Sequence, residues 1–179
     1  DSTMNVFFKL NHDRIYHGML STSLGPMDVA LGELGWALLR GLSYAVGFMA
    51  IVTPLGLIPS AWGILAIPAA VLIAFGFASF GMAVTSYMKS FQQLELVNIV
   101  LLPMFLFSGT FFPLSSMPIY LQPIGWISPL WHATELGREA AFDYGISNLM
   151  IAVHLTFLTS LVVIGLTLAM RQFERRLAK

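Results

Sequence analysis

The sequence predicts an all-α integral membrane protein with four membrane-spanning helices. Hydrophobic residues make up 57% of the 179 residues, charged residues make up 10%, and the mean hydropathy is +0.79. Ordinary soluble domains carry about 25% charged residues. The charges are also clustered, because residues 41–88, 96–134 and 144–170 contain none. Uncharged stretches of this length indicate that the chain crosses a bilayer several times.

Four apolar segments are long enough to cross about 30 Å of hydrocarbon at about 1.5 Å per helical residue. They cover residues 41–58, 63–86, 96–112 and 148–170, and the third is only just long enough. Pro68 is expected to kink the second segment or to lie in its first turn, and Pro103 is expected to bend the third.

Basic residues near the spans predict the orientation, because cytoplasmic loops are enriched in lysine and arginine. Four spans place both ends of the chain on one side. Eight of the nine basic residues fall on that side: Lys9, Arg14, Arg40, Lys89, Arg171, Arg175, Arg176 and Lys179. Arg138 alone falls on the other side. We therefore expect both ends to be cytoplasmic.

Residues 1–40 are polar enough to lie outside the bilayer, and residues 29–39 are expected to form an entry helix that continues into the membrane past Arg40. Residues 11–28 mix charged, aromatic and methionine side chains, and Asp28 is a candidate N-cap for the following helix. Two interpretations stay open for this stretch. It is either a cytoplasmic loop with an interfacial helix or a docking element for a cytoplasmic partner, whose composition suits protein contact.

The segment between the third and fourth spans points most directly to function. Residues 108–118 read SGTFFPLSSMP, and the chain stays apolar and uncharged until Glu135. Irregular backbone at membrane depth is tolerated only where protein or a water-lined cavity satisfies its polar groups. The orientation places this segment on the outer side, where gating, substrate release or structural capping would be possible.

Several polar and small residues have two interpretations. His154, inside the fourth span, would form an interhelical hydrogen bond or belong to a proton relay. His132 is expected at the outer interface. Ala70, Ala74 and Ala78 form a small-residue stripe for packing within the chain or between two copies. Asn98 requires a polar partner, and it lines either a pathway or a packed interface.

Glu135 and Arg138 belong to the only outer charge cluster. Their i, i+3 spacing predicts a helical surface pair. A contact with a substrate headgroup is the alternative.

The sequence lacks signatures of several catalytic sites. It contains no phosphate-binding loop, no HExxH zinc motif and no GxSxG nucleophile motif. It also contains no cysteine, which excludes disulfides and thiolate metal sites within these residues. Chemical energy would therefore come from another chain or from an ion gradient.

The combined motifs resemble the ABC-2 type transporter permeases, in particular the branch of lipo-oligosaccharide (nodulation-factor) and daunorubicin-type drug exporters. The residues that carry the resemblance are SGTFFPL at 108–114, Met117-Pro118, PLWH at 129–132, and Glu135-Leu136 with Arg138. The upstream run from Arg14 to Glu33 also resembles this family. The resemblance covers essentially the whole chain, so that residues 1–179 would form a single transmembrane domain.

The resemblance implies six spans per subunit, two permease subunits as a homodimer or a pair, and separate ATP-binding subunits that hold ATP and Mg²⁺. It implies a bacterial inner-membrane exporter of an amphipathic drug, lipid or lipo-oligosaccharide, with no catalytic, cofactor-binding or metal-binding residue in this chain. Because four spans are visible and the chain begins at Asp1, we expect an N-terminally truncated fragment.

The resemblance also implies two sites. The segment before the first visible span would contain the helix that couples to the ATPase: Arg14, Tyr16, Met19, Leu20, Thr22, Leu24 and Asp28. Ser23 stands where the family often has proline, which leaves the bounds of that helix open. Residues 113–135 would form an outer re-entrant segment. Its gate would involve Ser108, Gly109, Phe111, Phe112, Pro113, Met117, Pro118 and Pro129.

Two other classes remain as alternatives. A proton-driven small multidrug antiporter fits four spans and a membrane histidine, although such a mechanism normally requires an ionisable group at mid-membrane. A non-transporting membrane scaffold would tolerate substitutions across residues 108–118, whereas an exporter would not.

Overall fold

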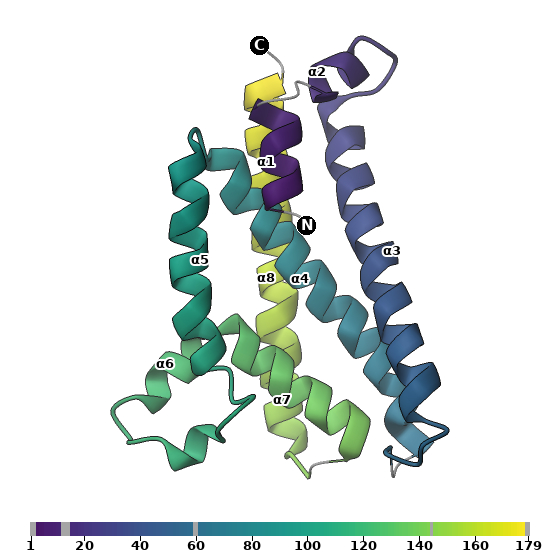
Figure 1. The fold of residues 1–179 in the computed structure, drawn as a ribbon, viewed down its shortest axis with the longest axis vertical. Helices are drawn as coiled ribbons and strands as arrows, with labels where there is room; N and C mark the ends of the chain where they lie inside the picture. The colour runs from purple at the N-terminus through teal and green to yellow at the C-terminus, as the bar shows by residue number, and fades with distance from the viewer. Residues whose placement is uncertain (1–2, 12–14, 59–60, 144, 178–179) are drawn as a thin grey trace. The chain divides into compact units, whose positions relative to one another are not determined.

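The computed structural model describes residues 3–11, 15–58, 61–143 and 145–177, and within these ranges every regular element is a helix (Figure 1). The helices, in chain order, are α1 (Met4–Asn11), α2 (Ile15–Leu20), α3 (Pro26–Val52), η1 (Ala61–Leu65), α4 (Ala66–Tyr87), α5 (Phe91–Leu106), η2 (Leu114–Ser116), α6 (Gln122–Ile127), α7 (Pro129–Phe142) and α8 (Asn148–Leu177). The α-helical class is confirmed.

Among the described residues, three helical segments are long and apolar enough to cross a membrane: Pro26–Val52, Gly63–Tyr87 and Asn148–Arg176. The helix of the predicted third span, α5, has 16 residues and ends before residue 112. It is therefore about 24 Å long, shorter than a typical hydrocarbon core. Pro68 lies in the first turn of α4, and Pro103 lies inside α5.

The first span differs most from the sequence prediction. Its helix begins at Pro26, three residues before the expected start at Val29, and ends at Val52, six residues before the expected end of the apolar segment at residue 58. Pro26 suits the first helical position, because its missing N–H needs no partner there. The carboxylate of Asp28 accepts a hydrogen bond from Gly25 N at 2.8 Å. The N-cap expectation for Asp28 is thus wrong, because Asp28 lies inside the first turn and bonds back to the residue before the helix.

Residue contacts divide the chain into two compact units. The first unit comprises residues 1–41, 74–96 and 160–179, and the second comprises residues 42–73 and 97–159. The first unit has a core of side chains from α1, α2, α3, α4 and α8. Its buried members are Val6, Leu10, Tyr16, Val29, Ala30, Leu34, Ala78, Met82, Ala83, Ala169 and Phe173.

Small residues let the backbones approach closely in the first unit. A Cβ atom placed on Gly165 of α8 would lie 2.6 Å from Phe80 N and 2.7 Å from Ser79 C of α4. On α3, a Cβ on Gly41 would lie 2.9 Å from the Ala74 Cβ. The small-residue face of α4 therefore has partners within the chain here, as the packing interpretation predicted.

Candidate functional site

The broken segment begins with a defined end of α5 in the second unit. Ser108 is fully buried, and its hydroxyl donates to the Phe105 carbonyl at 2.6 Å. The Ser108 and Thr110 hydroxyls are also 2.7 Å apart and share a hydrogen bond. Gly109 follows with φ +77°, a left-handed conformation that glycine adopts without steric cost. These bonds and the left-handed Gly109 form the turn that follows the end of α5.

Helix α7 holds this turn through Arg138. One guanidinium nitrogen donates to the Gly109 carbonyl at 2.7 Å, and the other contacts the Glu135 carboxylate at 3.1 Å. A Cβ on Gly109 would lie 3.2 Å from Trp131 Cδ1, so a larger residue would press on the indole. The predicted Glu135–Arg138 pair is confirmed, and Arg138 additionally fixes the backbone of the broken segment.

A histidine pair joins α7 to α8 in the same unit. His132 Nδ1 lies 2.8 Å from His154 Nδ1, and His132 Nε2 lies 2.9 Å from the Trp126 carbonyl. A carbonyl oxygen only accepts, so His132 Nε2 carries the proton. In the neutral pair His154 Nδ1–H then donates to His132. The interhelical hydrogen bond predicted for His154 is confirmed.

His132 does not lie exposed at the outer surface, as the sequence suggested, because the residue is only 2% exposed. It stacks on the Phe157 ring with 3.9 Å between centroids and 15° between planes. The spacing of α7 could have revealed this. His132, Leu136 and Ala140 recur at i, i+4, which is the period of one helix face.

The remaining residues of the predicted gate lie around short helices. Phe111 and Phe112 are 60% and 58% exposed, and the Phe111 ring packs edge-on against Phe105 at 5.2 Å. Pro113 and Met117 flank η2, followed by exposed Pro118, and Pro129 starts α7. The structure describes this segment as short helices and turns, and its gating role stays a prediction.

The predicted coupling residues fall into two groups in the first unit. Tyr16 is fully buried and its ring contacts Phe173 of α8, so it packs α2 against α8. Burial, together with the nearby Glu33 carboxylate, raises the pKa of the Tyr16 phenol. Leu20 is partly buried against the same core. Arg14 lies outside the described residues.

The second group of coupling residues is exposed. Met19 is 37% and Leu24 is 45% exposed, and Thr22 and Asp28 are exposed as well. The turn between α2 and α3 is hydrogen-bonded, since the Thr22 hydroxyl donates to the Met19 carbonyl at 2.6 Å. Two exposed apolar residues that the sequence analysis did not select, Ile15 and Met27, extend this surface. We call Ile15, Met19, Leu24 and Met27 the elbow surface.

The comparisons with known proteins agree with this arrangement. A sequence model of the ABC-2 type transporter family matches residues 3–142. The chain belongs to the ABC-2 type transporter family. Members of this family are membrane subunits of transporters and normally work with a cytoplasmic ATP-binding subunit. The resemblance inferred from residues 108–138 is therefore confirmed.

Curated relatives of this ABC-2 chain include nodulation proteins. Nodulation protein J of Sinorhizobium fredii is 30% identical over 173 residues, which cover 96% of this chain and 65% of the relative. Nodulation protein J of Neorhizobium galegae is 31% identical over 177 residues, which cover 97% and 66%. The chain thus spans about two thirds of the length of these relatives.

A third relative shares a shorter region. The probable multidrug ABC transporter permease YbhR of Escherichia coli is 30% identical over 70 residues, which cover 38% of this chain and 19% of the relative. No solved structure matches the chain. Together with the long apolar helices, these findings show a member of the ABC-2 type transporter family with several helices that are long enough to cross a membrane.

Proposed function

We propose that the chain is the permease part of an ATP-driven exporter that moves an amphipathic substrate outward across the bacterial inner membrane. The membership of the ABC-2 family carries this proposal. A drug, a lipid and a lipo-oligosaccharide all fit as substrate. The chain performs no chemistry, and a separate subunit binds ATP and Mg²⁺ and hydrolyses the nucleotide.

The elbow surface is our candidate for the ATPase contact. Four exposed apolar side chains on one short helix and the adjoining turn and helix start suit a protein partner better than water. Buried Tyr16 and the ion pair between Lys9 and Glu33, 2.6 Å apart, connect α2 and α1 to α3. A displacement of α2 would therefore reach the first span as a rigid-body movement.

The distribution of basic residues supports the orientation. Eight of the nine lysines and arginines belong to the first unit and one, Arg138, belongs to the second. Under the positive-inside tendency, the ends of the chain and the elbow surface face the cytoplasm. The broken segment faces outward, where Phe111, Phe112 and the neighbouring prolines would form a gate that excludes water and ions.

A second permease subunit is our proposed partner for α5. Leu96, Ile99, Val100 and Leu102 of this helix are between 59% and 74% exposed. Asn98 is exposed among them, and the described residues offer its amide no hydrogen bond. A polar side chain on an apolar helix is stabilised when a neighbouring helix supplies a partner.

The elbow surface gives the first test. Met19→Asp and Leu24→Asp place a charge where we expect a packed contact, so each should lower ATP-driven transport and the stimulation of ATP hydrolysis by roughly tenfold, about 1.4 kcal/mol of association. Transport into inverted vesicles and ATPase rates of the complex measure this. Gln92→Asp, an exposed change on the same expected side, is the matched control. Unchanged transport in both elbow variants would contradict the docking assignment.

A further inference from the structure

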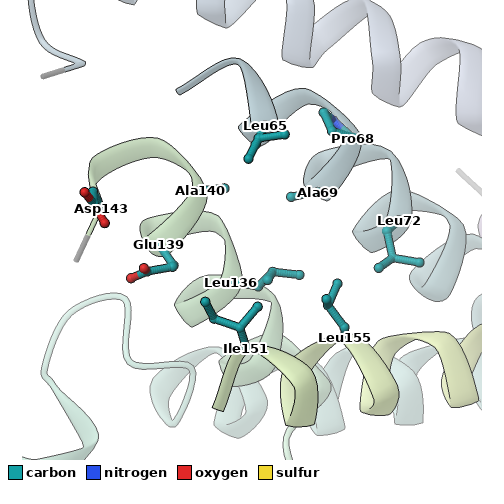
Figure 2. A pocket seen from close by; sticks show the side chains of 10 residues that line it. All are labelled: Leu65, Pro68, Ala69, Leu72, Leu136, Glu139, Ala140, Asp143, Ile151 and Leu155. Atoms are coloured by element: carbon teal, nitrogen blue, oxygen red, sulfur yellow. The ribbon is translucent and has the colours of Figure 1, made fainter. Parts of the chain in front are cut away.

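A cavity in the second unit is lined on one side by Leu136, Glu139 and Ala140 of α7 and by Asp143 directly after it, and Arg138 is not among its lining residues. Its volume is about 520 Å³, within the range of small-molecule sites. Figure 2 shows side chains from three segments around it: Leu65 to Leu72 on one side, α7 on another, and Ile151 and Leu155 of α8 on the third. Eight of its ten lining residues are apolar, so it suits an apolar body.

The two other lining residues are carboxylates at one end of the cavity. Glu139 and Asp143 lie at the C-terminal end of α7, away from Leu72 (Figure 2). Glu139 Oε2 accepts a hydrogen bond from Ile146 N at 3.0 Å, and the described residues give Oε1 no partner. Asp143 is exposed and ends the helix in a left-handed conformation. The C-terminal end of a helix adds a partial negative charge.

Within the described part of the second unit, no basic side chain pairs with either carboxylate. Glu135, Arg138, Glu139 and Asp143 are the only charged residues in the sequence of the second unit. Arg138 is already bound to Glu135 and to the Gly109 carbonyl. One end of this apolar cavity thus carries two acidic residues, an arrangement complementary to a positive charge on an apolar molecule.

We propose that this cavity binds an amphipathic organic cation, with the apolar body between η1, α4, α7 and α8 and the positive charge beside Glu139 and Asp143. A neutral lipid chain would fill the apolar part and leave the carboxylates without a counter-charge. An anion of the same shape would be repelled. Binding to this site needs neither ATP nor the ATPase subunit, so it is tested independently of the proposed transport function.

Tetraphenylphosphonium and tetraphenylborate provide matched probes, because they have the same shape and opposite charge. The complete permease in lipid nanodiscs should bind radiolabelled tetraphenylphosphonium saturably, and tetraphenylborate should not displace it. Glu139→Gln and Asp143→Asn together should weaken binding by at least roughly tenfold, about 1.4 kcal/mol. Ala140→Leu, which places a larger side chain in the cavity, should also weaken binding. Glu174→Gln, on an exposed part of α8 in the first unit, should leave binding within about twofold.

Several results would overturn the proposal. These are absence of saturable binding, equal displacement by tetraphenylborate, full binding by the double carboxylate variant or by Ala140→Leu, and a co-purified phospholipid that the cation does not displace. Melting temperatures confirm that each variant is folded. ATP-driven export, measured for the same variants in proteoliposomes that also contain the ATPase subunit, distinguishes a failed binding site from a failed transport assignment.

Discussion

Gly165→Val is expected to separate α8 from α4 and to destabilise the first unit by roughly 1–3 kcal/mol or more. The side chain would meet Phe80 N and Ser79 C at 2.6 and 2.7 Å. These are backbone atoms of a helix, which cannot turn aside as the tip of a flexible side chain can. The helix itself must therefore move. Gly165→Ala should show a smaller effect in the same direction, since even a single Cβ falls inside contact distance.

Gly35→Ala is the matched control for this prediction. Gly35 lies inside α3, and a Cβ there would meet nothing within 4 Å. Alanine has the higher helix propensity by about 1 kcal/mol, so this change should be neutral or stabilising. Thermal unfolding in detergent, monitored by tryptophan fluorescence, measures both variants. Equal melting temperatures for Gly165→Ala and Gly35→Ala would contradict the close α4–α8 approach.

Arg138→Met is expected to release the turn at Gly109 and to destabilise it by about 1–3 kcal/mol. The change removes the hydrogen bond to the Gly109 carbonyl and leaves the Glu135 carboxylate, 15% exposed, without its cation. Arg138→Lys should rescue only part of the loss, because an ammonium cannot reproduce the two-pronged geometry of a guanidinium. Hydrogen exchange of the amides in residues 108–113 should accelerate in both variants.

A double-mutant cycle separates the ion pair from the backbone contact. Adding Glu135→Gln to Arg138→Met removes the uncompensated charge, so the double variant should be more stable than Arg138→Met alone. Exchange at residues 108–113 should nevertheless stay fast, because the Gly109 carbonyl still lacks its donor. If exchange in Arg138→Met matches that of the unmodified chain, Arg138 does not hold the turn.

Apolar length predicted where the long helices lie, but not every one of their bounds. The sequence located α4 and α8 closely, since their apolar stretches coincide with the helices. The predicted start of α3 at Val29 is three residues late, because Asp28 was expected to be the N-cap and instead lies in the first turn. Pro26 at the first helical position and the hydrogen bond from Gly25 N to the Asp28 carboxylate favour a helix start here, although the residues that follow include charged ones.

The sequence predicted several residues of the site, but not most of the contacts between them. The i, i+3 spacing within α7 was enough to pair Glu135 with Arg138. The bond from Arg138 to Gly109 joins positions that are 29 residues apart, and no local pattern encodes it. The His132–His154 contact is likewise set by how α7 packs on α8. The acidic cavity was missed for the same reason, since its walls come from three separate segments.

Cross-linking of single-cysteine variants to the ATP-binding partner tests the central claim most directly. These 179 residues contain no cysteine, so each new cysteine here is the only one within them. Met19→Cys and Leu24→Cys on the elbow surface should cross-link to the ATPase in the assembled complex. Ile119→Cys, which is 82% exposed on the segment expected to face outward, should not. Cross-links from position 119, or none from positions 19 and 24, would contradict a permease whose elbow surface contacts the ATPase.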